Sequence, residues 1–566
     1  MRRRHTAHYQ PTTAFLLLTA VAVPLVWSLW GATAAALDTT AWAALLHDPQ
    51  IVRALGLSVW TGLLSAMLAT LLSAWILSAT VGRAQGTAHT HRLTRWLAPM
   101  LAVPHAAFAI GLVALLAPSG WMLRLLSPWA TGLNAPPPWA TTQDPWGLGL
   151  VAVLVFKEVP FLLWAAMAHL QRPDVARRLQ QELLLAHTLG YSESNAWWRV
   201  GWPQLLPRLT APLLAVLAYS LTVVDVALII GPTTPPTLSV LAWQWLQDAD
   251  PAMNAQGAAS AWLLAGMLVL CAALTWAAKQ APLWAQRWTR GAAPLSATIA
   301  DLEQGKSAHR MPHNLPTTPA LLMLVYLLVL LALLVGSVTG YWPFPQAWPT
   351  AFTWAAWQSV LASNSTLWTT VWLATASASI ALAWAVAWLE WAPPLWQARM
   401  QPLLTLPLVL PAVLWVVGLH RVSLDWQLDT TGLGLWLAHT LACLPYVLLA
   451  LQGPYTGFDP RLRHVAATLG RGPGAFLWQV KWPLLRSALA ASFAIGFAVS
   501  VAQYLPTLYV GAGRFATVTT EAVNLAAGGQ RSLTATFAWL QWLLPVLVFA
   551  LATRLGRSQF KHVSAH

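Results

Sequence analysis

Long apolar runs separated by polar loops dominate this chain of 566 residues. An α-helix needs about 20 apolar residues to cross a hydrocarbon core about 30 Å thick. We predict such helices at residues 14–36, 55–79, 96–117, 147–170, 209–231, 258–280, 318–340, 363–391, 401–420, 430–453, 488–510 and 533–554. The pattern therefore indicates an all-α polytopic membrane protein with about twelve transmembrane helices.

Composition supports a membrane location. Hydrophobic residues make up 57% of the chain and charged residues only 8%, whereas a soluble domain carries about 25% charged residues. The 37 tryptophans suit the membrane interface, where the indole ring is buried and its N–H stays hydrated. Cys271 and Cys443 both fall in predicted helices, so the chain has no disulfide framework.

The formal net charge of +14 is explained by where the basic residues lie. Of the 31 lysines and arginines, 25 fall in segments that we place in the cytoplasm and five in outer segments, while Lys157 sits inside a helix. This asymmetry is the positive-inside rule, which sets orientation. The basicity therefore requires no nucleic acid, and both termini are expected in the cytoplasm.

The N-terminal region has some features of a signal peptide. Arg2 to Arg4 precede an apolar stretch that runs from Ala14 to Trp30 and is followed by small residues, as in a cleavable signal. The apolar run is long for such a signal. We therefore predict that it is retained as the first transmembrane helix, although cleavage would leave the later orientations unchanged.

One loop motif occurs twice, 280 residues apart. It reads A-x-T-L-G-x9-V-x-W-P, first in the loop 171–208 and again in the loop 454–487. The matched pairs are Ala186 and Ala466, Thr188 and Thr468, Leu189 and Leu469, Gly190 and Gly470, Val200 and Val480, Trp202 and Trp482, and Pro203 and Pro483. Both copies lie in arginine-rich cytoplasmic loops, so they predict two docking points for a partner with two-fold symmetry.

The duplication extends beyond the loops. Pro104-x6-Gly111 matches Pro411-x6-Gly418 at an offset of 307, and Gly231 matches Gly511 at 280. The change of offset places an insertion largely in the outer loop 118–146. We predict two parallel repeats of six helices each, at 1–280 and 317–566, joined by a cytoplasmic linker at 281–316.

The repeated loop resembles the EAA loop of bacterial ABC-importer permeases, whose pattern is E-A-A-x3-G-x9-I-x-L-P. Gly190 and Gly470 match its glycine, and Leu184 and His464 stand where the family has glutamate. Ala186 and Ala466 match the second alanine, Val200 and Val480 the isoleucine, Trp202 and Trp482 the leucine, and Pro203 and Pro483 the proline. Without the glutamate, docking would rest on shape and apolar contact.

Over nearly the whole chain, the resemblance is closest to fused double permeases of the ferric-iron and thiamine importer type. It implies a MetI-like fold of two permease halves around a central path, in the bacterial inner membrane. The implied partners are a cytoplasmic ABC ATPase homodimer and a periplasmic solute-binding protein. Thiamine-like or ferric solutes are favoured, and polyamines and oxyanions stay open.

Nothing in the sequence predicts an enzyme or a bound cofactor. Gly305-Lys306-Ser307, five residues after Ala300, fits a relaxed phosphate-binding loop, but the linker is too short to hold a nucleotide-binding domain. We therefore expect the ATPase to be a separate chain. His105, His420 and His439 lack the spacing of metal ligands and are predicted to be packing residues.

Three charged residues, Lys157, Glu158 and Asp225, lie in predicted membrane helices, where charge is costly and often functional. One hypothesis pairs Lys157 with Asp225 across the helix interface. Such charges either hold the bundle together, as a buried pair or as a snorkelling side chain, or they contact solute on the central path. An ion-coupled secondary transporter with twelve helices would also use these charges, but it predicts no paired docking loop. Glu390, near the cytoplasmic face, is expected to be solvated.

Overall fold

The computed structural model describes residues 10–80, 97, 99–170, 172–280 and 317–557. The linker 281–316, which contains the Gly305-Lys306 motif, lies outside the described residues, as do Arg2 to Arg4 and the last nine residues of the chain.

The described part of the chain is helical throughout, apart from loops and one isolated bridge between Thr339 and Phe352. It contains eleven helices that are long and apolar enough to cross a membrane, or twelve if a bent pair forms one span. The spanning segments are built on α1 (Pro11–Ala36), α3 (Ile51–Thr80), α5 (His105–Leu116), α7 (Leu148–Leu170), α11 (Thr210–Thr222), α14 (Pro251–Gln280), α17 (Thr317–Ser337), α19 (Asn364–Trp391), α20 (Pro394–Leu404) with α21 (Ala412–Asp425), α23 (Leu433–Thr456), α26 (Trp482–Val501) and α29 (Arg531–Arg557). The predicted all-α polytopic fold is confirmed.

The bent pair corrects the prediction of a straight helix at 401–420. The chain turns by 92° between the segment that ends at Leu408 and α21. Pro407 and Pro411 lie at this turn, and a proline lacks the N–H that would continue the helix while it restricts the residue before it. The two prolines therefore divide one apolar run into two helices.

Two short helices were missed because the sequence predicted outer loops there. They are α13 (Leu238–Leu246) and α28 (Val518–Ala526), and most of their residues are buried. The N–H of Leu238 donates to Ser58 Oγ at 2.9 Å, and the N–H of Val518 donates to Thr370 Oγ1 at 3.0 Å. Each hydroxyl thus satisfies a free N–H at a helix start, and the two starts lie 280 residues apart.

The first helix of each predicted repeat packs on a helix of the other. Helix α1 runs along α21, and α17 runs along α5. A Cβ at Gly111 of α5 would come 2.6 Å from Val329 Cγ1 of α17, and a Cβ at Gly418 of α21 would come 1.7 Å from the Ser28 carbonyl oxygen of α1. The repeated P-x6-G pattern therefore marks two close helix crossings, where a small residue lets the backbones approach.

The outer loop 118–146 is fastened to the loop that follows α17. Arg124, in α6 (Trp121–Leu126), is only 4% exposed. Its guanidinium donates to the carbonyls of Pro343 at 2.8 Å and Trp342 at 3.1 Å, and Trp121 Nε1 donates to Ala347 O at 3.0 Å. The insertion thus joins outer loops of the two predicted repeats.

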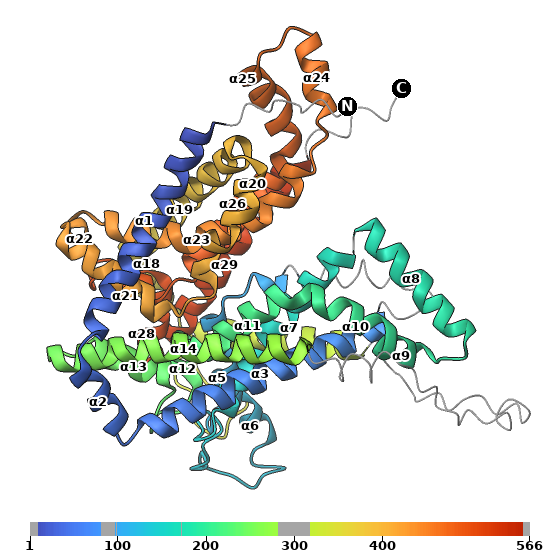
Figure 1. Ribbon diagram of the computed structural model, residues 1–566. Coiled ribbons are helices and arrows are strands. Elements are labelled where there is room, and N and C mark those ends of the chain that lie inside the picture. The colour runs from blue at the N-terminus through green and yellow to red at the C-terminus, as the bar shows by residue number, and fades with distance from the viewer. Residues whose placement is uncertain (1–9, 81–96, 98, 171, 281–316, 558–566) are drawn as a thin grey trace, which may run out of the picture.

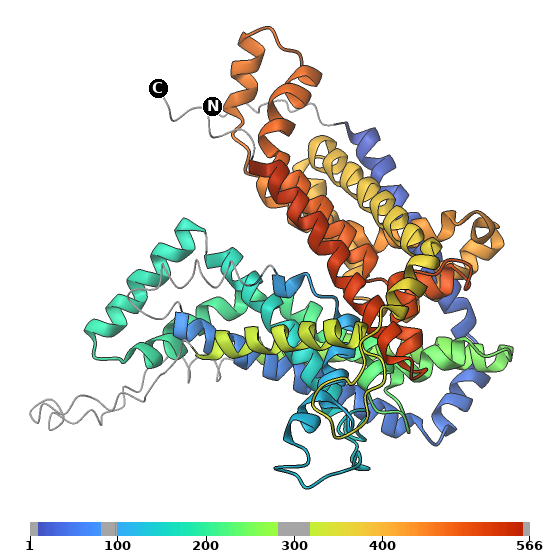
Figure 2. The ribbon, with the colours of Figure 1, turned by 180° about the vertical axis from the view of Figure 1, so that it is seen from behind.

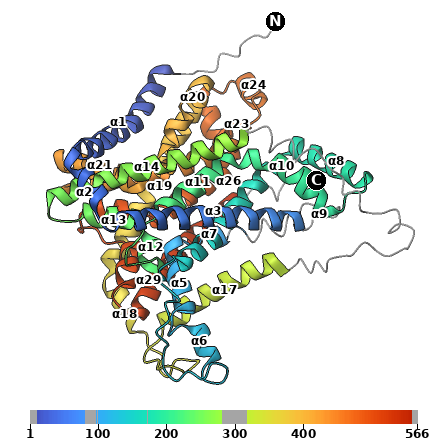
Figure 3. The same ribbon diagram turned by 60° about the horizontal axis from the view of Figure 1, so that its bottom comes forward.

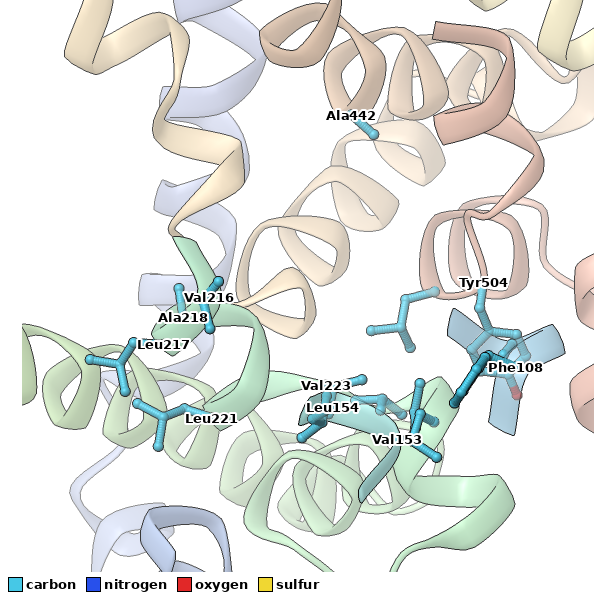
Figure 4. Close-up of a cluster of buried hydrophobic side chains, with 14 of the residues drawn as sticks. Phe108, Val153, Leu154, Val216, Leu217, Ala218, Leu221, Val223, Ala442 and Tyr504 are labelled. Carbon is cyan, nitrogen blue, oxygen red and sulfur yellow. The ribbon is translucent and has the colours of Figure 1, made fainter. Parts of the chain in front are cut away.

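The helices form two arms that diverge like the limbs of a V (Figures 1 and 2). The first arm contains α3, α7 and α11, and the second contains α19, α23 and α26. The arms meet near α12 (Asp225–Ile230), α13 and α28, where Tyr509 Oη donates to Trp243 O at 3.2 Å. A buried apolar cluster draws residues from both predicted repeats, including Phe108 and Leu154 from one and Tyr504 from the other (Figure 4). The rotated view shows α3 and α17 extending from this junction toward the same side as α8, which is Pro173–Thr188 (Figure 3).

Candidate functional site

The two loops that carry the repeated motif, 171–208 and 454–487, are called the first and second docking loops after the role predicted for them. The first reverses the chain at the end of α8 (Pro173–Thr188). Gly190 has φ +86°, a left-handed conformation that glycine adopts without steric cost. Its N–H donates to His187 O at 3.0 Å, and the N–H of Tyr191 donates to Ala186 O at 3.1 Å. This pair of bonds is a Schellman closure. The alanine and the glycine of the repeated motif therefore stand at the spacing that a Schellman closure requires.

The second docking loop has the same closure at the end of α24 (Arg461–Thr468). Gly470 has φ +73°. Its N–H donates to Ala467 O at 3.0 Å, and the N–H of Arg471 donates to Ala466 O at 2.9 Å. The two copies therefore agree in their backbone hydrogen bonds as well as in sequence.

Each docking loop then enters one π-helical turn before the next membrane helix. The turns are Trp197–Gly201 and Leu477–Lys481, and they contain Val200 and Val480 of the repeated motif. The Trp-Pro pair follows directly in both copies, with Pro203 and Pro483 in the first helical turn, where a missing N–H costs nothing. Turns of this type are frequent at functional sites.

Apolar side chains remain exposed on both docking loops. In the first, Leu184, Leu185 and Leu189 are 61–70% exposed; in the second, Leu469 is 74% and Trp478 71% exposed. Exposed apolar groups gathered at one place mark an interaction surface. Leu184 occupies the glutamate position of the EAA pattern, so this surface presents a hydrocarbon side chain where that pattern has a carboxylate.

The first loop is anchored by an indole and a carboxylate. Trp197 is fully buried, and its Nε1 donates to Ala74 O of α3 at 3.0 Å. Glu182 accepts hydrogen bonds from Arg178 Nε at 2.9 Å and from Gln204 Nε2. Partial burial opposes ionisation of Glu182, but these hydrogen bonds outweigh it and hold the pKa of the carboxyl below its ordinary value.

The second loop is anchored by an ion pair that the sequence did not predict. Lys481 Nζ lies 2.6 Å from Glu390 Oε2, and Tyr455 Oη donates to the same oxygen at 2.8 Å. The Glu390 side chain is 16% exposed, so the expectation that it is solvated is wrong. The partners are 91 residues apart in the chain, and no local pattern joins them.

The predicted Lys157–Asp225 ion pair is also wrong. Among the described residues, the ammonium of Lys157 instead donates to the carbonyl oxygens of Met100 at 3.2 Å and Val103 at 2.5 Å. It also lies 5.6 Å from the centre of the Tyr326 ring. Because Lys157 is only 3% exposed, these contacts hold it within the protein.

The other two membrane charges lie near His105. Its Nε2 is 3.3 Å from Glu158 Oε1, and its ring centre is 4.6 Å from that of Tyr219. Asp225 is the first residue of α12, which packs against α5, the helix that begins with His105. His105 therefore contacts a charged partner, beyond the packing role predicted for it.

The remaining predicted histidines differ in their surroundings. The ring of His439 is buried between hydroxyls, with Ser500 Oγ at 2.8 Å and Thr507 Oγ1 at 2.9 Å, as a packing residue would be. His420 lies 6.2 Å from the ring of Tyr509. In the described part of the chain, no group of three or more His, Cys, Asp or Glu side chains is placed to hold a metal ion.

We predict that Lys157→Ala lowers the melting temperature of the purified protein by a few degrees, because two buried carbonyls lose their donor at about 1–3 kcal/mol. Exchanging Lys157 and Asp225 should not restore it, since the two side chains do not pair. Thermal unfolding in detergent measures both effects. A double exchange that recovers the native melting temperature would show that the pair exists.

Known proteins resemble the chain in sequence. It is 34% identical over 549 residues to the inner membrane ABC transporter permease protein YnjC of Escherichia coli K12, which is 96% of each chain. It is 24% identical over 516 residues to the thiamine transport system permease protein ThiP of the same organism, covering 87% of this chain and 86% of ThiP.

A shorter stretch of 127 residues, 20% of this chain, is 32% identical to the molybdenum transport system permease protein ModB of Mycobacterium tuberculosis H37Rv and covers 48% of it. A comparison with models of known families finds no match. The similarity to YnjC nevertheless extends over nearly the whole chain. The many apolar helices agree with it, and the chain is a multi-pass inner membrane protein that belongs to the ABC transporter permeases.

Proposed function

We propose that this permease is the fused transmembrane subunit of an ABC importer and moves a small solute from periplasm to cytoplasm. Residues 1–280 and 317–566 would form its two halves, with both termini in the cytoplasm. A separate ATPase homodimer would supply the energy and a periplasmic solute-binding protein the solute. The chain itself would catalyse no reaction.

The paired docking loops carry this proposal. Gly190 and Gly470 close their helices in the same way, and exposed apolar residues adjoin each closure. An amphipathic helix binds a partner by laying its apolar side in a groove. Two equivalent loops would suit two equivalent grooves, one on each ATPase. We assign the docking role to Ala186, Gly190, Val200, Pro203, Ala466, Gly470, Val480 and Pro483.

The arrangement of the arms supports alternating access. The docking loops lie at the ends of separate arms, while the arms join near α12, α13 and α28 (Figures 1 and 2). Closure of the ATPases on ATP would draw the loops together and open the opposite side of the path. Such coupling requires a ligand that interacts differently with the two states, and the loops would transmit that difference.

The proposed solute is thiamine-like or ferric. Two relatives are named for thiamine and for molybdenum transport, and the sequence resemblance favours a thiamine-like or ferric solute. A proton-coupled secondary transporter is the second candidate, because Glu158 and Asp225 lie in the membrane region. That alternative gives no role to the duplicated loops.

Affinity purification of the tagged protein from its native membrane, followed by mass spectrometry, tests the proposal. We expect an ABC ATPase to co-purify in mild detergent and to be lost from the Gly190→Arg, Gly470→Arg double variant. Solute uptake should stop when ATP is depleted. Uptake that survives ATP depletion but collapses with the proton gradient, with no ATPase bound, would identify a secondary transporter.

A further inference from the structure

We propose that His105, Glu158 and Asp225, together with the rings of Tyr219 and Tyr446, form a binding subsite for an organic cation on the path between the two arms. This inference rests on the proposed transport function and specifies the chemical class of the solute.

The partial exposure of these side chains places them on a surface within the helix bundle. His105, Tyr219 and Asp225 are each partly accessible, although the residues on either side of them along the chain are almost all buried. Tyr446 is 42% exposed between the buried residues Pro445 and Val447. These side chains therefore border open space within tightly packed segments, as residues that line a path would.

Contacts within the first arm bring three of these residues together. His105 of α5 contacts Glu158 of α7 at 3.3 Å between Nε2 and Oε1. The ring of His105 also packs against that of Tyr219 of α11, with a centroid distance of 4.6 Å. Three different helices thus converge on one imidazole, and the Glu158 carboxylate is held 7% exposed beside it.

The second arm contributes Tyr446, which lies on α23. Helix α12, which begins with Asp225, packs against α5 and α7 and also against α28 of the second predicted repeat. A subsite shared by both arms would change shape when the arms move, as alternating access requires.

The charge of this group favours a cation. The group has two carboxylates, those of Glu158 and Asp225. They outnumber the one ammonium next to Glu158 in the chain, that of Lys157, whose donors are directed to the carbonyls of Met100 and Val103. An unbalanced charge in a membrane protein is costly and marks an ion or solute pathway. A positively charged solute would neutralise it, whereas an oxyanion would add to it.

The aromatic rings favour an organic cation over a bare metal ion. A tyrosine face attracts an organic cation through its negative quadrupole, and the attraction grows when water is excluded. Glu158 already shares its carboxylate with His105, which leaves it suited to long-range attraction and a single hydrogen bond. Carboxylates and tyrosine rings in one group match a cation with an apolar body.

Equilibrium binding to the full chain in lipid nanodiscs tests the subsite. The probes are thiamine, choline and putrescine as organic cations, with molybdate and ferric citrate as competitors of other classes. We expect at least one organic cation to bind more tightly than either competitor. Glu158→Gln and Asp225→Asn should each weaken its binding about tenfold or more, since a charged hydrogen-bond partner is lost.

Two further variants separate an effect on the subsite from a general effect of removing a carboxylate. Tyr446→Leu removes an accessible ring without changing the charge and should also weaken cation binding. Asp248→Asn removes a carboxylate on an exposed loop and should leave binding unchanged. Tighter binding of molybdate or ferric citrate, no binding of any organic cation, or unchanged affinity in Glu158→Gln and Asp225→Asn would overturn the subsite.

Co-purification of the ATPase distinguishes this failure from failure of the proposed function. Variants of the subsite should keep the ATPase bound, because the docking loops are intact. If an ATPase binds but no cation does, the permease assignment stands and the subsite falls. If a cation binds but no ATPase is present in any preparation, the subsite stands and the importer proposal falls.

Discussion

The Gly190→Arg, Gly470→Arg double variant is expected to abolish ATP-driven uptake while the protein still inserts and folds. A Cβ at either glycine would meet no atom within 4 Å, so an arginine would project from the surface rather than into the fold. The left-handed φ adds a cost of about 1–2 kcal/mol per site. Uptake into proteoliposomes that contain the ATPase and the solute-binding protein measures the loss.

The expected loss of ATPase binding follows from the position of the two glycines on the docking surface. Each arginine would stand next to Leu189 or Leu469, which are 70% and 74% exposed, and would disrupt apolar contact with the partner. Loss of a strong contact costs about 2 kcal/mol or more at an interface. Two such losses correspond to roughly a thousandfold weaker ATPase binding.

Alanine at the same two positions provides the matched control. Gly190→Ala with Gly470→Ala imposes the same backbone strain but adds only a methyl group, so most uptake should remain. Equal membrane levels of the alanine and arginine variants would exclude a folding defect. Normal uptake by the arginine variant would remove the docking role from both loops.

Much of the architecture could be predicted from the sequence because its signals are local. A run of about 20 apolar residues is both necessary and nearly sufficient for a spanning helix, so most of the observed spans follow the predicted runs. The predicted helices 209–231 and 488–510 are the further exceptions, since the chain breaks after Thr222 in the first and after Val501 in the second. The turn at Gly190 is equally local, since the alanine that accepts the hydrogen bond lies four residues before the glycine. Such features need no knowledge of distant partners.

Features that depend on distant partners could not be predicted. Helices α13 and α28 are nine residues each, too short to be recognised as spans, and they begin where Ser58 and Thr370 accept their first N–H groups. The partner of the charged residue Lys157 could not be predicted for the same reason. Opposite charges in membrane helices suggest a pair, but Lys157 is satisfied by backbone carbonyls, which carry no sequence signal.

The close crossing of α1 and α21 leads to the second large prediction. Gly418→Val should reduce the amount of folded protein in the membrane and lower its melting temperature by several degrees. A Cβ at Gly418 would lie 1.7 Å from the Ser28 carbonyl oxygen, so the helices would have to separate. Separation would break the hydrogen bond from the Ser28 hydroxyl to the Trp415 carbonyl. Overpacking of this kind typically costs about 1–3 kcal/mol.

Gly266→Val is the matched control, since Gly266 also lies inside a membrane helix, α14, but a Cβ there would meet no atom within 4 Å. Its melting temperature and membrane level should match those of the native protein. Gly111→Val should behave like Gly418→Val, because a Cβ at Gly111 would approach the Val329 carbonyl oxygen of α17 to 2.9 Å. If Gly418→Val were as stable as Gly266→Val, the close packing of α1 on α21 could not hold. The repeated P-x6-G pattern would then need another physical explanation.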